Sequence, residues 1–288
     1  MLNFWRVMNL QFSSALARKV FGYYYRAGRT YVIPFGPLRG CRLRYEKMVT
    51  FHAMLGLLDR DIFRVMERVL VRSGSVPRNA TVADVGANIG IYTLWFARVM
   101  APRGRVYAFE PGPLALVLLK ESVAVNRLAN VEIEEQACGA EVGLASFHVA
   151  ANFHTSSLVT ENCAQMAGST GTITVRQITL DAYFAEDSGR PAPDMIKMDI
   201  EGGGVFALPG CGKTVRRKRP FILIESHTPK EDRAISDLLL EHDYEAYRLT
   251  NRQWVGRREE THPTADGVWG TLLLCPREKA DEIRRALG

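Results

Sequence analysis

Val82-Ala83-Asp84-Val85-Gly86-Ala87-Asn88-Ile89-Gly90-Ile91-Tyr92-Thr93 is the stretch that decides the fold of this 288-residue chain. A short apolar run ends in a glycine-spaced turn, and residues 91–97 continue with the pattern of a helix. This order predicts a strand, a tight loop and a helix N-terminus, the unit with which a doubly wound α/β sheet builds a nucleotide pocket. Gly86 and Gly90 let the backbone turn sharply and let a ligand lie close against it.

A second apolar run, residues 105–109, ends at Glu110. A carboxylate at the tip of the second strand is placed to accept hydrogen bonds from both hydroxyls of a ribose. The glycine loop and Glu110 together indicate an adenosine-type ligand.

The composition is that of an ordinary globular protein, with 47% hydrophobic and 24% charged residues. A chain of this length has enough apolar side chains for a core that needs neither disulfides nor metal. Its five cysteines are scattered and include no Cys-x-x-Cys pair. This argues against a zinc site and a disulfide framework, and favours a reducing, cytoplasmic location.

Positive charge is concentrated at the front of the chain. Residues 1–80 carry 14 Lys and Arg against 4 Asp and Glu, whereas the remainder carries 23 against 27. Residues 1–28 place large apolar side chains at three- and four-residue steps, which predicts a helix. We interpret it either as a packed lid or dimer helix, or as a basic amphipathic helix in peripheral contact with a membrane. A homodimer is thus left open, and we expect no nucleic-acid partner.

About seven apolar core strands follow, with helices between most of them, which predicts a mostly parallel sheet. The connection between the last two strands lacks helical periodicity and indicates an antiparallel edge strand. A polar loop over residues 151–170 is longer than a structural connection needs, so it is a candidate substrate loop.

The loop chemistry separates two nucleotide classes. A dinucleotide fingerprint has a glycine where this chain has Asn88, and that glycine lets a pyrophosphate approach the helix. Asp84 would repel a pyrophosphate but would suit the ammonium group of an amino acid, directly or through water. An adenosine with a cationic amino-acid tail is S-adenosylmethionine (SAM), so a methyltransferase is favoured over an NAD-dependent oxidoreductase.

The chain contains, in this order, the motifs Asp84–Gly90, Phe109-Glu110-Pro111, Lys197–Gly202 and Glu225-Ser226-His227. In their order and spacing these motifs resemble the FkbM family of SAM-dependent methyltransferases. The resemblance covers roughly residues 50–250. It implies a Rossmann-like class I methyltransferase fold with a seven-stranded sheet, and O-methylation of a sugar, glycan or polyketide-type natural product. A metal is not generally implied. The family usually has Glu two residues after the glycine of its Asp-x-Glu-Gly motif, where this chain has Gly204.

The expected domains are an N-terminal helical and loop extension (1–50) and a methyltransferase domain (51–288). The predicted cofactor residues are Asp84, Gly86, Asn88, Gly90, Glu110, Pro111, Gln136, Ala137 and Cys138. The glycine loop should hold the methionine part of SAM, Glu110 the ribose, and residues 136–138, at the end of the third strand, the adenine.

Catalysis requires a base for the acceptor hydroxyl, which is a poor acid. The predicted catalytic residues are His227, Asp199 and Glu201, with His227 or Asp199 as the base and His154 on the polar loop as a further candidate. Asp199, Glu201 and Glu225 could hold Mg²⁺, but we expect no metal, because carboxylates at strand ends are common without one. N-methylation and a non-catalytic SAM-binding or scaffold protein are the alternative functions.

Overall fold

The structure is a computed structural model that describes residues 24–46, 48–150, 156–159, 169–249, 252–255 and 270–287. It divides into two compact units, residues 1–60 and 61–288. Most of the predicted N-terminal helix, residues 1–23, and His154 of the candidate substrate loop lie outside the described residues.

The described part of the first unit contains a hairpin and a short helix. Strands β1 (Thr30–Val32) and β2 (Arg42–Arg44) pair antiparallel, and the segment between them contains Pro34, Gly36, Pro37 and Gly40, which are typical turn residues. Helix α3 (Met48–Met54) follows.

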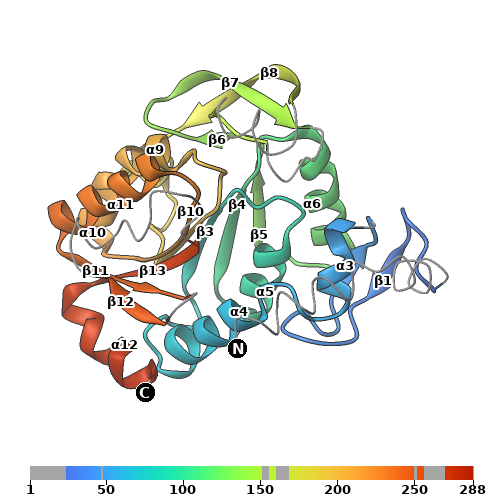
Figure 1. The fold of residues 1–288 in the computed structure, drawn as a ribbon, viewed down its shortest axis with the longest axis horizontal. Helices are drawn as coiled ribbons and strands as arrows, with labels where there is room; N and C mark the ends of the chain where they lie inside the picture. The colour runs from blue at the N-terminus through green and yellow to red at the C-terminus, as the bar shows by residue number, and fades with distance from the viewer. Residues whose placement is uncertain are drawn as a thin grey trace. The chain divides into compact units, whose positions relative to one another are not determined.

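The second unit is built on an eight-stranded sheet of order β12-β11-β13-β10-β9-β3-β4-β5 (Figure 1). Its strands are β3 (Thr81–Val85), β4 (Arg105–Phe109), β5 (Val131–Glu134), β9 (Met195–Met198), β10 (Phe221–Ser226), β11 (Tyr244–Arg248), β12 (Gln253–Val255) and β13 (Gly270–Pro276). The five strands from β5 to β10 run parallel, which confirms the mostly parallel sheet.

The antiparallel part of the sheet differs in detail from the expectation. The short β12 adds an eighth strand and is the antiparallel edge. Strand β13 is also antiparallel, but it lies inside the sheet between β10 and β11. Its residues 271–275 are almost completely buried, as a strand with neighbours on both sides requires.

Helices cover both faces of the sheet (Figure 1). They are α4 (Arg60–Met66), which continues as the π-helix η1 (Glu67–Arg72), α5 (Ile91–Val99), α6 (Pro113–Val125), α8 (Leu180–Tyr183), α9 (Gly204–Ala207), α10 (Gly212–Lys218), α11 (Pro229–His242) and α12 (Ala280–Leu287). Short 3₁₀ turns are η3 (Glu186–Ser188), η4 (Pro209–Cys211) and η5 (Arg277–Lys279). Strand β4 shows the alternation: Tyr107 and Phe109 pack in the core beneath α8, α10 and α11, whereas Ala108 packs against Leu119 of α6.

A second, three-stranded sheet lies at the top of Figure 1. It consists of β6 (Ala137–Cys138), β7 (Gly143–Ala150) and β8 (Ser169–Ile178), in the order β6-β8-β7. The chain enters it directly from β5, so the predicted third strand, residues 131–137, is divided between the two sheets. This brings residues of β6 and β7 to the carboxyl ends of the main parallel strands, where the pocket described below lies.

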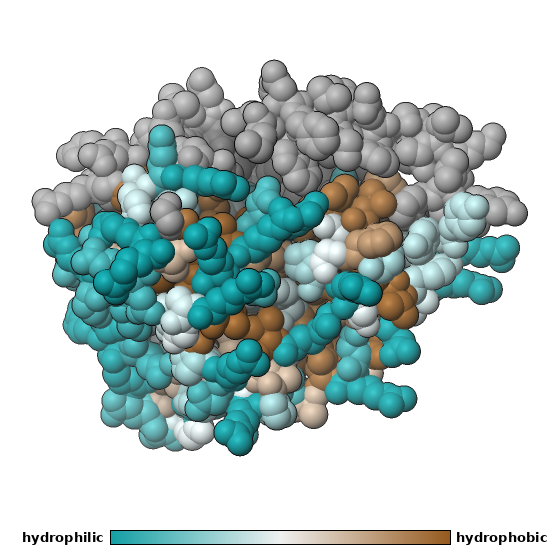
Figure 2. Space-filling view, turned by 90° about the horizontal axis from the view of Figure 1, so that it is seen from below, coloured by the Kyte–Doolittle hydropathy of each residue, from teal (hydrophilic) through white to brown (hydrophobic). Residues whose placement is uncertain are grey.

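Within the described residues, no helix is long and apolar enough to cross a membrane. Figure 2 shows one face of the molecule, on which charged and polar side chains are spread between smaller apolar areas.

Candidate active site

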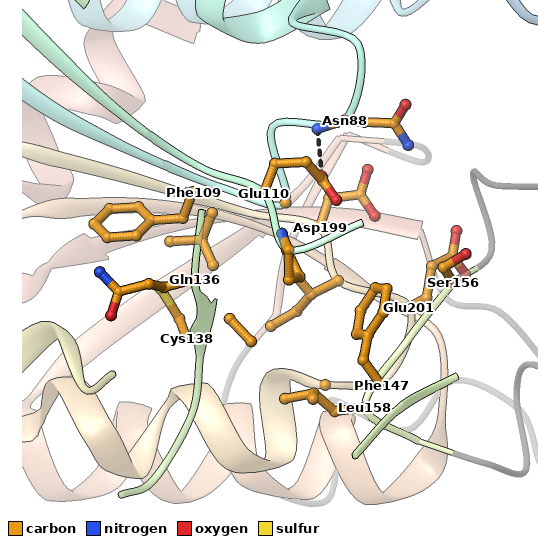
Figure 3. Close-up of a pocket in the computed structure, with 16 residues that line it drawn as sticks. Asn88, Phe109, Glu110, Gln136, Cys138, Phe147, Ser156, Leu158, Asp199 and Glu201 are labelled. Carbon is orange, nitrogen blue, oxygen red and sulfur yellow. Dashed lines mark hydrogen bonds between the residues drawn. The ribbon is translucent and has the colours of Figure 1, made fainter. Parts of the chain in front are cut away.

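A pocket opens at the carboxyl ends of β3, β4 and β9 (Figure 3). Its lining residues are Val85, Gly86, Asn88, Phe109, Glu110, Pro111, Gln136, Ala137, Cys138, Phe147, Ser156, Leu158, Asp199, Ile200, Glu201 and Gly203. Seven of the nine predicted cofactor residues and two of the three predicted catalytic residues are in this set. Asp84, Gly90 and His227 are not among the lining residues.

The glycine loop is fixed by backbone contacts. The amides of Gly86 and Ala87 both donate to the carbonyl of Phe109, at 3.0 Å each. Gly86 has φ +75°, and a Cβ there would come within 2.0 Å of the Asp199 carbonyl oxygen. The site therefore needs glycine at 86 for a close approach between the loop after β3 and the loop after β9. Gly90, with φ +93°, is the N-cap of α5, and its amide donates to the Ala87 carbonyl at 2.8 Å.

Glu110 closes the turn after β4. Its Oε2 accepts from the Asn88 amide at 2.8 Å (the dashed line in Figure 3), and its Oε1 accepts from the Gly112 amide at 2.7 Å. Burial, only partly offset by these two hydrogen bonds, raises the pKa of Glu110 to about 7. The carboxylate is thus locked in one orientation at the pocket wall, where a ribose would meet it.

Asp84 does not face the pocket. Its side chain is fully buried, and its carboxylate accepts from Thr93 Oγ1 at 2.6 Å and lies 3.5 Å from Lys197 Nζ. Asp84 and Lys197 are register partners on adjacent parallel strands, so the pairing follows from the sheet itself. The predicted direct contact of Asp84 with the ammonium group of an amino acid does not fit this geometry, because Lys197 already supplies its counter-charge.

Lys197 joins the two halves of the site. Its Nζ donates to the carbonyl of Gly86 at 2.9 Å and lies 3.8 Å from Asp199 Oδ2, with the Tyr92 ring at 5.0 Å from the ammonium group. A lysine this deeply buried is retained only when it is paired. It therefore stabilises the position of the glycine loop relative to Asp199.

An acidic group surrounds His227 at the ends of β9 and β10. His227 Nε2 lies 3.6 Å from Asp199 Oδ1, 3.6 Å from Glu201 Oε2 and 3.9 Å from Glu225 Oε1. On the other side of the ring, Nδ1 lies 3.6 Å from Glu231 Oε2. The three predicted catalytic residues are therefore brought together, and Glu225 and Glu231 join them.

The protonation states of this group differ from a simple histidine base. Burial alone would lower the pKa of His227, but the contact with Glu231 and the charges of Asp199 and Glu201 outweigh it and raise the pKa to about 10. Burial raises the pKa of Glu201 to about 7, although the charge of His227 opposes this. At neutral pH His227 is thus an imidazolium, and a carboxylate beside it is the group able to accept a proton.

Asp199, Glu201 and His227 also bring one ligand atom each within 4.8 Å of one another, close enough to share a divalent cation. The protonated ring of His227 is itself a cation next to these carboxylates. The carboxylates therefore have a counter-charge without a metal ion.

The candidate substrate loop reaches the site through its described residues, 156–159. Ser157 Oγ donates to the Glu201 carbonyl at 2.8 Å, and its backbone pairs with His148 of β7. Ser156 and Leu158 line the pocket beside Phe147. Figure 3 shows these residues and Glu201 at one end of the pocket, with Phe109, Gln136 and Cys138 at the other.

Sequence reasoning missed the pocket residues Phe147 and Leu158 and the buried Glu231. Nothing local marks Phe147 and Leu158, because they are ordinary apolar residues of a strand and a loop. Glu231 carries a weak signal, since Thr228 and Glu231 have the spacing of a helix capping box, which marks the start of α11 but not the burial of the acid.

The mostly parallel sheet carries a glycine loop after its first strand and a carboxylate after its second strand. An acidic group follows its fourth and fifth strands. Together these features define a Rossmann-like class I methyltransferase fold. The comparisons with known proteins carry the assignment further. The Methyltransferase FkbM domain matches residues 84–246, more than half of the chain. The chain belongs to the FkbM family of methyltransferases, which confirms the resemblance given by its motifs.

Individual relatives are distant. Methyltransferase sdnD of Sordaria araneosa is 23% identical over 192 residues, 58% of this chain and 74% of that protein. The 31-O-demethyl-FK506 methyltransferase FkbM of Streptomyces tacrolimicus is 29% identical over 139 residues, 46% of this chain and 52% of that protein. The crystal structure of methyltransferase FkbM from Methylobacillus flagellatus KT aligns with 77% of this chain and 52% of its own, at 18% identity and a TM-score of 0.46. The chain thus spans about half the length of the last two.

Proposed function

We propose that this methyltransferase uses SAM to methylate a hydroxyl oxygen of a sugar, glycan or polyketide-type natural product. The observation that carries the proposal is the charge of the pocket. Its described lining contains the carboxylates of Glu110, Asp199 and Glu201 and no lysine or arginine. Such a lining suits a ligand with an ammonium and a sulfonium group, and it disfavours the pyrophosphate of NAD.

The two ends of the pocket suggest how the cofactor lies. The end with Phe109, Gln136 and Cys138 offers apolar walls and an amide for the adenine, and Glu110 accepts from the ribose hydroxyls. The backbone of Gly86 and Asn88 borders the methionine part. When bound, SAM supplies an electrophilic methyl group on a positively charged sulfur.

The acidic end handles the proton of the acceptor. Glu201 has a pKa of about 7, close to the pH at which a general base is most effective, so we assign it the acceptor proton. Asp199, also in the lining, orients the hydroxyl. The protonated His227 stabilises both carboxylates in place, a role that replaces the predicted base function of this histidine.

Oxygen is favoured as the acceptor atom by the relative from Streptomyces tacrolimicus, whose name describes methylation of 31-O-demethyl-FK506. N-methylation of an amine is the second candidate, because an acidic pocket end would also attract an ammonium group. A non-catalytic SAM-binding protein is the third, and its sequence basis is the departure at Gly204.

Two measurements test the proposal. Isothermal titration with S-adenosylhomocysteine and with NAD should show binding of the first alone, and the reverse result would overturn the cofactor assignment. Transfer of labelled methyl from SAM should then be measured with sugars, lipid-linked glycans, polyketides and amines. Label in a hydroxyl compound supports O-methylation, label in amines alone supports N-methylation, and binding without transfer to any of them favours the non-catalytic protein.

A further inference from the structure

Glu231 is a buried carboxylate that ties two separate segments together. It lies in the first turn of α11, and its side chain is fully buried. Its Oε1 accepts from the Gly204 amide at 2.9 Å, and its Oε2 accepts from the His227 amide at 2.8 Å. A buried carboxylate needs such donors, and here one comes from the start of α9 and the other from the segment after β10.

Gly204 leaves the space that this carboxylate fills. A Cβ added at Gly204 would lie 2.5 Å from Glu231 Oε1 and 2.9 Å from its Cγ. Gly204 is not among the glycines with positive φ, so its backbone does not require glycine. The close approach of Glu231 is therefore the physical reason for glycine at this position.

The cap of α11 positions the backbone of Glu231 but does not use its carboxylate. Thr228 Oγ1 accepts from the Glu231 amide at 3.1 Å, which is one half of a capping box. In the other half the carboxylate would bond back to the Thr228 amide. Instead it extends to His227 and Gly204. The side chain is thus directed toward the site rather than toward its own helix end.

His227 is held from both sides by this arrangement. Glu231 Oε2 accepts from its backbone and lies 3.6 Å from its Nδ1, while Nε2 faces Asp199, Glu201 and Glu225. Lys197, a second cationic side chain near the site, lies next to Asp199. Glu231 is thus the carboxylate that faces Nδ1, on the opposite side of the ring from the carboxylates of the pocket.

We propose that Glu231 is a positioning residue for His227, and that its carboxylate occupies the space that Gly204 leaves open. The proposal rests on the function proposed above, because it gives the His227 ring a role in methyl transfer. It also explains the departure at Gly204, where the family resemblance leads one to expect Glu. The carboxylate is present, but it comes from another element.

The first test is the titration of His227 by NMR, which needs no acceptor. Proteins labelled at histidine are compared as wild type, Glu231→Gln and Glu241→Gln, with His227→Gln used to assign the signal. Glu231→Gln should lower the pKa of His227 by at least one unit, about a tenfold change in proton affinity. Glu241→Gln changes an exposed acid of the same helix and should leave it unchanged. An unchanged pKa in Glu231→Gln would overturn the proposal.

The second test moves the carboxylate. Gly204→Ala and Glu231→Gln should each lower turnover by about tenfold or more, while S-adenosylhomocysteine affinity stays within about threefold. The double variant Gly204→Glu/Glu231→Ala should regain at least about tenfold over Glu231→Ala. No recovery, together with an unshifted His227, would contradict the proposal. If wild type binds the cofactor but methylates nothing, the proposed function fails while the His227 titration still decides the positioning of the ring.

Discussion

The two ends of the pocket are built in different ways. At the cofactor end, backbone groups fix the position of the site: the amides of Asn88 and Gly112 hold Glu110, and the Phe109 carbonyl holds the glycine loop. The acceptor end consists of charged side chains from β9, β10 and α11 around His227. Backbone groups bind one ligand shape, whereas titratable side chains can hold and move protons. The first end is thus suited to a constant cofactor and the second to chemistry.

Replacing the proposed base should give the largest effect and should be confined to turnover. Glu201→Gln keeps the size of the side chain but cannot accept a proton, so kcat should fall roughly 100- to 10,000-fold. S-adenosylhomocysteine affinity should change by no more than about threefold, because Glu110 and the glycine loop are intact. Methyl-transfer kinetics and calorimetry give the two values. Wild-type turnover in Glu201→Gln, with a loss in Asp199→Asn, would transfer the role of base to Asp199.

A side chain added where the loop after β3 contacts the loop after β9 should destabilise the whole protein. Gly86→Ala places a methyl group 2.0 Å from the Asp199 carbonyl, at a residue with φ +75°. We expect a loss of about 3 kcal/mol in the free energy of unfolding, measured with urea. Gly143→Ala is the matched control, since nothing lies within 4 Å of its Cβ position. Equal stability of the two variants would show that the two loops are free to move apart.

The same division decides what the sequence could predict. The strands β3 and β4 and the glycine loop follow from adjacent residues, because apolar runs and glycine spacing are local signals. Glu110 follows from its place after β4. The pairing of Asp84 with Lys197 depends on the register of two strands more than 100 residues apart, although a lysine within the apolar β9 does indicate a buried partner.

For the acceptor end, the sequence predicts which residues take part but not how they contact one another. Asp199, Glu201 and His227 follow apolar strands and were expected at one sheet edge. The raised pKa of His227 results from Glu231 together with Asp199 and Glu201, and the sequence places Glu231 in an ordinary capping position on α11. Likewise, Gly204 taken alone only departs from the Glu that the family usually has there. Taken together with Glu231, it leaves the space that the Glu231 carboxylate occupies. Packing between distant segments, which no local pattern encodes, determines both.

Cofactor affinity should depend on pH through Glu110. Its pKa is about 7, and only the ionised carboxylate can accept from both ribose hydroxyls. Because the ionised fraction falls as pH decreases through 7, S-adenosylhomocysteine should bind about tenfold more weakly at pH 6 than at pH 8. Glu110→Gln should bind weakly at both values without this dependence, whereas Glu201→Gln should retain it. Calorimetry at the two pH values measures this, and a flat wild-type profile would mean that Glu110 does not bind the ribose as an anion.

Removal of metal ions should have the smallest effect, because a protonated His227 supplies a positive charge among the acceptor-end carboxylates. His227 Nε2 lies equally close to Asp199 and Glu201, and its pKa of about 10 keeps it charged at neutral pH. Methyl transfer after dialysis against EDTA should stay within about twofold of the untreated enzyme, and added Mg²⁺ or Mn²⁺ should not raise it further. The opposite result, a loss that a divalent cation restores, would make the same three residues a metal site. The acceptor end would then resemble the cofactor end in holding a fixed ligand, and the base would have to be sought elsewhere.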